Sequence, residues 1–322
     1  MMPGQQLSGT AGSAVAGAAL ARFAEARGRR VFEAMGVLWA EYRWPFFASL
    51  PYQQQHDLDP RELSGALRAE RVPAVRYPTR TQPGWPCGLY VLAPGGYSLS
   101  RISPKRRRLV RRGLEETECR PLDPEELLAQ GLELNLETMA RHQRFDPEFG
   151  EPARWKRLVA AIRDSPGVSI GGGYVRGRLS CYHVNCRDGA WLHLLYKMSR
   201  TEDLPSNSSL ALDYWTLSEA GKDPTIEAVE NGFPSVISGD TLHHYKTQLG
   251  FELLPFNVSM RFHPAVQPLL ANRWSAGVAG ALSSLRPRSR GLERIARVLK
   301  GAHLSSAEGG GAASPDLGEQ SS

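Results

Sequence analysis

Hydrophobic positions in the middle of the chain change from helical to extended spacing in a regular order. After the N-cap signal Asp123-Pro124, apolar side chains recur at helical spacing as far as Met139, and a second helical pattern surrounds Trp155. Three extended apolar runs follow without a helical interval, and short Gly-containing turns separate them. These runs occupy residues 168–175, 179–186 and 190–198. The pattern predicts two helices followed by an antiparallel meander.

A crossover unit is predicted after the meander. A loop from Ser199 to Ser209 precedes an apolar helix over residues 210–221, and a short strand is expected at residues 225–229. Because a helix joins them, this strand should run parallel to the strand at residues 190–198. The remaining predicted elements are a helix from about residue 240 to 249, which Gly250 would end, and one or two strands within residues 251–262.

The first 116 residues show a partial set of similar elements. Residues 1–30 are rich in Ala and Gly and are expected to form a flexible or loosely helical leader. The dense aromatic stretch at residues 37–47 is interpreted as core or interface. Asp59-Pro60 and Ser103-Pro104 have the form of helix N-termini, with a capping side chain followed by proline. Strands are expected between these two helices, at residues 73–77 and 88–92.

Composition limits the class of protein. The chain has 322 residues, a formal charge of +6 and a pI near 9.2, a balance that favours phosphate-bearing partners. Four cysteines without a CxxC pair predict neither a disulfide scaffold nor a metal site. No apolar run reaches the length of a membrane span, and the N-terminus lacks the basic region of a secretory signal. We therefore expect a cytoplasmic protein without a transmembrane segment.

Two stretches favour an anionic ligand. The strand, loop and helix from Trp191 to Gly221 would direct backbone N–H groups and the positive end of a helix dipole to one point. The segment Lys105–Arg112 has six basic residues among eight, on a predicted helix. Its basic face is interpreted either as a solvated surface or as a surface that binds the phosphates of a nucleotide or an RNA.

The order of elements from Thr117 to Phe262 resembles the GNAT-type N-acyltransferase fold. Within that superfamily the chain is similar to the bacterial-type FemAB-like aminoacyl transferases and the BioF2-like acetyltransferases, which share an aromatic-Lys-x-x-x-Gly-Phe ending found here at residues 245–251. The resemblance implies an α+β fold with a mixed sheet, in which a degenerate GNAT-like half precedes the complete domain. The expected divisions are a leader (1–30), the degenerate half (31–116), the acyltransferase domain (117–265) and a basic helical segment with a disordered tail (266–322).

The resemblance also implies a donor site. In such folds the strands at residues 190–198 and 225–229 separate, and the exposed edge between them pairs with the donor. No permanently bound cofactor is implied, and the co-substrate is an acyl-CoA or an aminoacyl-tRNA. The glycine-rich loop of acyl-CoA users is absent here, which leaves both donors open. The residues expected to bind the donor are Leu195, Tyr196, Lys197, Ser206, Asn207, Ser208 and Ser209.

Transfer from such a donor to an amine requires a positioned proton acceptor, a cation for the oxyanion and an acid for the leaving group. The candidate catalytic residues are Tyr245, Lys246 and Asp240, and Arg141 and His142 are candidates for binding the acceptor. His183 and His193 are interpreted as structural. The expected acceptor is an amine-bearing small molecule or a cell-wall or polysaccharide precursor, with tRNA a possible partner and DNA not expected. The alternative is a non-catalytic protein of the same fold that binds RNA through the basic helix.

Overall fold

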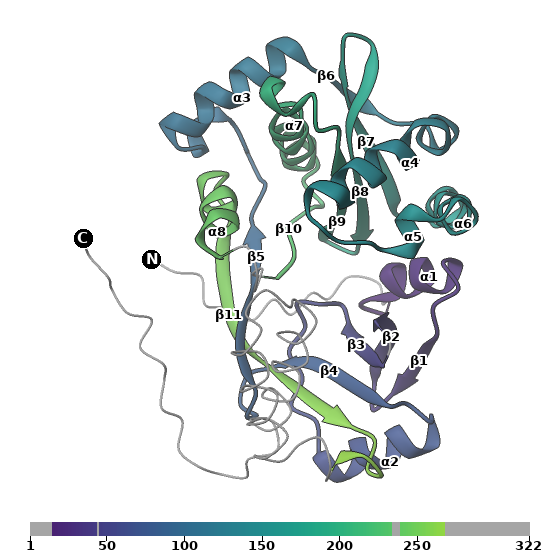
Figure 1. Cartoon of the computed structure of the whole chain (residues 1–322). Coiled ribbons are helices and arrows are strands. Elements are labelled where there is room, and N and C mark those ends of the chain that lie inside the picture. Colours follow the sequence, from purple (N-terminus) through teal and green to yellow (C-terminus); the bar gives the residue numbers. More distant parts are fainter. Residues whose placement is uncertain (1–14, 44, 234–238, 268–322) are drawn as a thin grey trace, which may run out of the picture. The chain divides into compact units, whose positions relative to one another are not determined.

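The computed structural model describes residues 15–43, 45–233 and 239–267 (Figure 1). The chain forms two compact units that are interleaved along the sequence. The first comprises residues 1–54 and 87–255, and the second comprises residues 55–86 and 256–322. Neither unit ends at residue 116. The expected division at that residue, between a degenerate copy of the fold and the complete domain, stays a prediction.

A mixed sheet forms the centre of the first unit. Its strands are, in spatial order, β5 (Trp85–Leu92), β10 (Ala228–Glu230), β9 (Trp191–Ser199), β8 (Arg178–Asp188), β7 (Val168–Val175) and β6 (Glu118–Pro121). The pair β9–β10 is parallel and the other neighbours are antiparallel. The meander and the parallel crossover strand are thereby confirmed, although the crossover strand occupies residues 228–230 and not the predicted 225–229. The α+β class with a mixed sheet is confirmed as well.

Helices cover both faces of this sheet (Figure 1). On one face, α7 (Ser208–Lys222) packs on β7 and β8, and α3 (Pro104–Glu116) packs on α7. Three consecutive glycines in β7 permit this close approach, since a Cβ atom at Gly171 would lie 2.9 Å from the Trp215 ring. The other face is covered by α4 (Pro124–Arg141), α5 (Pro147–Gly150) and α6 (Pro152–Asp164). A buried apolar cluster that includes Trp155 and Tyr182 fills the space between these helices and the sheet.

The N-terminal segment is partly helical. Residues 18–26, within the stretch expected to be a flexible or loosely helical leader, form the helix α1 (Ala18–Ala26). The backbone N–H groups of Gly17 and Ala19 donate to the Asp188 carboxylate at 2.7 and 2.9 Å, and Phe23 is buried in the core. The short strands β1 (Val31–Ala34), β2 (Val37–Arg43) and β3 (Phe46–Leu50) follow as an antiparallel ladder.

The second unit contains α2 (Pro60–Ala69) and the antiparallel pair formed by β4 (Ala74–Thr79) and the end of β11 (Glu252–Phe262). Asp59 caps α2 as predicted, because its carboxylate accepts from the N–H groups of Arg61 and Glu62. The final stretch is one continuous strand. Residues 268–322, which contain most of the predicted basic helix and tail, lie outside the described residues.

The remaining helix signals are confirmed with one exception. Asp123 caps α4 through the N–H of Glu125, and Gly250 follows α8 (Gly239–Gln248) with a φ of 92°. Ser103 precedes α3, but its side chain makes no capping hydrogen bond, so the predicted cap is wrong. The proline at the first turn is sufficient to begin that helix. The connections also contain two 3-10 turns, η1 (Leu99–Arg101) and η2 (Leu204–Ser206).

Candidate functional site

Strands β9 and β10 separate near the middle of the sheet. Their parallel pairing ends at the pair His193 and Glu230. Beyond this point β9 stays with β8, whereas the chain after β10 follows β5: the N–H of Asn231 donates to the Tyr90 carbonyl, and the N–H of Tyr90 donates to the Gly232 carbonyl. A β-bulge at Leu195, which has no partner on β8, lies just beyond the end of the pairing. The sequence-predicted donor residues Leu195, Tyr196 and Lys197 therefore line the edge that β10 leaves unpaired.

Lys246 comes to this separation from α8. Its side chain is only 6% exposed, and its Nζ donates to the backbone carbonyl of Asn231 and lies 4.3 Å from the centroid of the Tyr90 ring. Burial, together with the positive charge of Lys197, lowers the pKa of Lys246 to about 8. A buried lysine of this kind is a cation near neutral pH that changes charge at mildly alkaline pH.

A second polar cluster lies on the α7 face of β9. Asp213 of α7 is 2% exposed, and its two carboxylate oxygens accept from Lys197 Nζ and from the Tyr245 hydroxyl. Burial alone would raise the pKa of Asp213, but the positive charge of Lys197 and the hydrogen bonds hold it below its ordinary value. His183 also faces Asp213, with its Nε2 3.6 Å from the carboxylate, and burial lowers the pKa of His183 to about 3. His183 is therefore neutral.

A histidine–carboxylate pair marks the point where the strands part. His193 is fully buried, and its Nδ1 lies 2.9 Å from Glu230 Oε2. The other carboxylate oxygen of Glu230 accepts from the N–H of Gly232, which fixes the carboxylate. An ionised carboxylate only accepts, so in this pair Nδ1 is the donor, and in the neutral imidazole Nε2 keeps a lone pair. No described residue hydrogen-bonds to that Nε2.

The predicted donor loop is well ordered by contacts within the protein. Asn207 adopts a left-handed conformation at the start of α7, and the Ser206 hydroxyl donates to the Asp203 carbonyl. Ser208 is buried and accepts from the Ser180 hydroxyl at 2.8 Å. Helix α3 packs directly on this loop, because a Cβ atom at Gly113 would lie 2.8 Å from the Asn207 carbonyl oxygen. The basic helix is thereby placed beside the N-terminus of α7. Donor binding by this loop stays a prediction.

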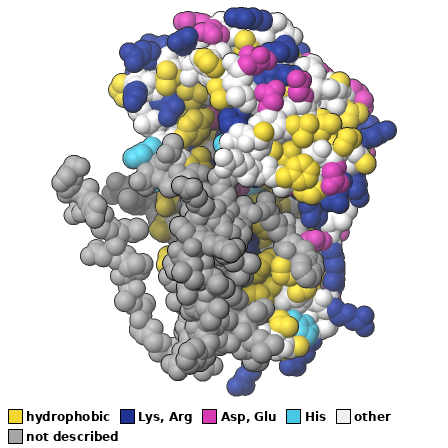
Figure 2. All heavy atoms as spheres, viewed as in Figure 1, with side chains coloured by type: hydrophobic (Ala, Val, Ile, Leu, Met, Phe, Trp, Pro, Cys, Tyr) yellow, Lys and Arg dark blue, Asp and Glu magenta, His cyan; other side chains and the backbone are white. Residues whose placement is uncertain are grey.

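Basic side chains on α3 divide into two sets. Some have partners within the protein: Arg106 donates to Gln248 and lies over the Tyr245 ring, and Arg112 pairs with Glu116. Lys105, Arg108 and Arg111 are exposed. Figure 2 shows basic side chains gathered at the upper left, where Figure 1 places α3.

The other predicted site residues are spread around the fold. The Arg141 guanidinium donates to the hydroxyls of Thr201 and Ser199, both at 2.9 Å, so it ties the end of α4 to the end of β9. His142 is exposed at the C-cap of α4. The backbone of Asp240 lies in the first turn of α8, and its side chain lies outside the described residues. Roles for these three residues stay predictions.

Sequence reasoning missed two residues of the site. Asp213 lies in an apolar helical pattern, and the signal that could have identified it is a carboxylate on the face of a helix that is otherwise buried. Glu230 is the last residue of a three-residue strand and follows the predicted end of that strand by one position. Its spacing from His193 is a property of the parallel register, which the sequence does not show.

The described residues contain no cluster of three or more His, Cys, Asp or Glu suited to a metal ion. None of the described helices combines the length and the apolar character that crossing a bilayer requires. None of the four cysteines forms a disulfide bond.

The separated parallel strands, the helices on both faces and the bulge in β9 define the class of fold: it is the fold of GNAT-type, Fem-like acyltransferases. No protein-family model and no curated protein sequence matches the chain. Among solved structures it is similar to FemX, with a TM-score of 0.55 and 11% identity over 81% of this chain and 96% of that one.

Two further similar structures carry the name of one enzyme. One is lysylphosphatidylglycerol synthetase (L-PGS) from Bacillus licheniformis, with a TM-score of 0.52 and 11% identity over 77% of this chain and 88% of that one. The other is the C-terminal domain of a putative lysylphosphatidylglycerol synthetase from Agrobacterium fabrum, with a TM-score of 0.51 and 9% identity over 74% and 86%.

Proposed function

We propose that the chain is an acyltransferase that moves an acyl or aminoacyl group from an activated donor to an amine. The observation that carries this proposal is the separation of β9 from β10, with the buried Lys246 on one side of it and the His193–Glu230 pair at its apex. An extended donor would add to the free edge of β9 as a further strand. The similar solved structures support transfer chemistry, since two of them are named for the synthesis of an aminoacylated lipid.

The proposed reaction is a direct transfer. The acceptor nitrogen attacks the donor carbonyl carbon, a C–N bond forms, and the C–S or C–O bond to the donor breaks. The Lys246 ammonium stabilises the negative charge that develops on the carbonyl oxygen. The amine proton passes to His193 Nε2, and the leaving thiolate or ribose oxygen takes up a proton in turn. Asp213 and Lys197 hold the Tyr245 hydroxyl and the edge of β9 in place.

Donor binding tests the proposal first. We expect either acetyl-CoA or a mixture of charged tRNAs to raise the midpoint of thermal unfolding, because a ligand at about 100 times its Kd stabilises the folded state by about 2.7 kcal/mol. Differential scanning fluorimetry with free CoA and uncharged tRNA as controls measures this shift. If neither acetyl-CoA nor charged tRNA raises this midpoint, the transferase proposal is contradicted.

RNA that binds without any transfer to amines would instead support the non-catalytic alternative, which rests on the exposed basic residues of α3.

The His193–Glu230 pair gives a second prediction. We expect His193→Gln to reduce turnover by about 100-fold or more, because proton transfer by a positioned group contributes about 10²–10⁴-fold. Steady-state rates with a series of amine acceptors measure the effect, and acceptors whose amines are already neutral at the assay pH should be affected least. A matched substitution on the same sheet, His183→Gln, is the control, since His183 faces the other side of β8. Equal losses in the two variants would show that His193 is only structural.

A further inference from the structure

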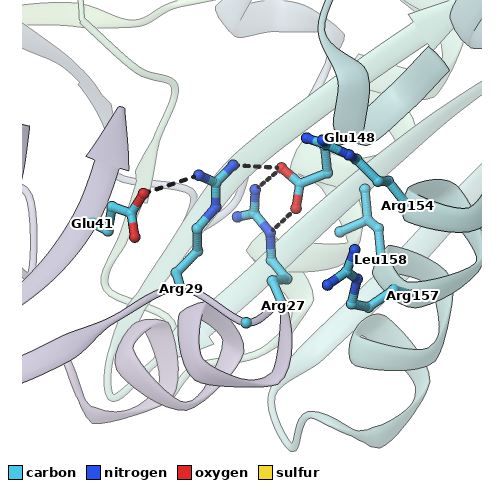
Figure 3. Close-up of a pocket in the computed structure, with 8 residues that line it drawn as sticks. Arg27, Arg29, Glu41, Glu148, Arg154, Arg157 and Leu158 are labelled. Atoms are coloured by element: carbon cyan, nitrogen blue, oxygen red, sulfur yellow. Dashed lines mark hydrogen bonds and ion pairs between the residues drawn. The ribbon is translucent and has the colours of Figure 1, made fainter. Parts of the chain in front are cut away.

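A polar pocket lies on the face of the first unit that α5 and α6 cover (Figure 3). It has a volume of about 170 Å³, where a single buried water needs only about 10–15 Å³. Four arginines come to it from two directions: two follow α1 and two lie on α6. They are Arg27, Arg29, Arg154 and Arg157.

The charges of the pocket do not balance. Glu148 and Glu41 are the carboxylates in its lining, and Glu151 pairs with Arg154 from outside the lining, so four guanidinium groups leave an excess of one positive charge. Arg27 takes both oxygens of Glu148, with its Nε at 2.8 Å from Oε1, and Arg29 shares one of them at 3.2 Å. Glu41 lies 3.6 Å from Arg29. One carboxylate therefore serves two arginines, and Arg27 reaches it through Nε and Nη2, which leaves Nη1 for another acceptor.

Two arginines of α6 complete the lining of the pocket. Arg154 pairs through its Nε with Glu151 at 2.7 Å, which leaves its terminal nitrogens available. Arg157 is exposed, and no described residue forms an ion pair with it. In Figure 3 the side chains of Arg154 and Arg157 extend from α6 beside Arg27 and Glu148. Planar guanidinium groups arranged in this way match the oxygens of a phosphate, which they bind in bidentate fashion.

The pocket is joined to the proposed reaction site through aromatic side chains. The guanidinium of Arg27 lies 5.2 Å from the centroid of the Tyr196 ring, on the edge strand β9. Tyr52 is within electrostatic reach of both Arg27 and Glu230, and its ring packs edge-on against His193 at 6.1 Å. This is the α4–α6 face of the sheet, whereas Lys197 and the predicted donor loop lie on the α7 face.

We propose that the Arg27–Arg29–Arg154–Arg157 pocket binds a phosphate group of the acceptor. The acceptor is therefore a phosphate-bearing amine whose nitrogen reaches the point where β9 and β10 separate. The assignment of the phosphate to the acceptor rests on the proposed function. The binding of phosphate by the pocket does not. The excess of positive charge and the terminal guanidinium nitrogens of Arg154 and Arg157 fit the negative charge of a phosphate group.

Binding of pyrophosphate to the purified full chain tests the pocket directly. We expect saturable binding by isothermal titration calorimetry, weakened roughly 100-fold in the double variant Arg154→Gln/Arg157→Gln, because each charged hydrogen bond removed costs at least a factor of ten. The matched control is Lys156→Gln/Arg163→Gln, which removes two charges from the same helix outside the pocket. Both pairs are exposed, and equal melting temperatures for the two variants would show that α6 remains folded.

Two outcomes would overturn the proposal of a phosphate site: no pyrophosphate binding at millimolar concentration, or an equal loss of pyrophosphate affinity in the control variant.

Competition then distinguishes a phosphate of the acceptor from a phosphate of the donor. If saturating acetyl-CoA or charged tRNA displaces pyrophosphate, the pocket belongs to the donor and the acceptor assignment is wrong. Pyrophosphate binding without any stabilisation by a donor would leave the pocket intact and contradict the transferase function instead, so the two failures are distinguishable.

Discussion

Replacing Lys246 with methionine is expected to lower turnover by about 10²–10³-fold, because one donor to a developing oxyanion in a site that excludes water is worth that much. Methionine keeps the length and most of the volume of the buried side chain, so the change removes chiefly the charge. The control is Lys222→Met, since Lys222 is an exposed lysine whose ion pair is with Glu219 of the same helix. Steady-state kinetics with saturating donor measure the difference. Normal turnover in the Lys246 variant would remove this residue from the reaction.

The pH dependence provides a second test of Lys246, in which turnover and stability should change in opposite directions. Its pKa is about 8 in the folded protein and 10.5 as a free side chain. Turnover that needs the ammonium form should therefore fall as the pH rises through about 8. Stability should change in the other direction: between about pH 8 and 10.5 the unfolded chain binds the proton that the folded chain has lost, so the free energy of unfolding rises with pH, by up to about 3 kcal/mol.

Chemical denaturation across this range measures the stability, and both trends should disappear together in Lys246→Met. A turnover profile that keeps its alkaline fall in the variant would assign that fall to another group.

Replacing Asp213 with asparagine is expected to destabilise the protein by about 3–5 kcal/mol. The carboxylate is buried, and its loss leaves the ammonium of Lys197 without its counter-charge. The control is Asp223→Asn, because Asp223 forms an ion pair with Arg187 in which both side chains are more than one third exposed, and such pairs contribute about 0–1 kcal/mol. Urea denaturation monitored by fluorescence measures both.

A double-mutant cycle with Lys197→Met separates the ion pair from the rest of the Asp213 network. The double variant should be more stable than Asp213→Asn alone, since it no longer leaves the partly buried Lys197 cation without a partner. The folded-state pKa of Asp213 lies below its ordinary value, so its contribution is present at neutral pH and is lost as the pH falls through the acidic range. Additive effects of the two substitutions would show that the ion pair carries no coupling energy.

Local signals in the sequence located most elements correctly. Asp59 and Asp123 cap their helices because an Asp-Pro pair provides both the acceptor and the fixed backbone angle of a first turn. The alternation of β7, β8 and β9 could be read directly, because their turns are short and contain glycines with positive φ. Residues 18–26 could not be assigned this way. An Ala-rich helix has weak periodicity, and its order depends on Asp188, which lies about 170 positions further along the chain.

The candidate site was predictable only in part. Tyr245, Lys246 and Lys197 were predicted from a motif and from the strand–loop–helix pattern, and the structure brings Lys197 and Tyr245 together on the carboxylate of Asp213. Asp213, Glu230 and the arginine pocket were not identified. Each of them depends on pairing between elements that are distant in the chain, such as the Arg27–Glu148 contact.

The sequence by itself determined the order of helices and strands, the parallel crossover between β9 and β10 and the place of the loop before α7, because these follow from side-chain period, capping and turn chemistry. Only the tertiary structure decided which polar side chains meet. The end of the β9–β10 register places His193 against Glu230, and the approach of α8 brings Lys246 to Asn231. Such meetings are set by packing between distant segments, and local periodicity does not encode them.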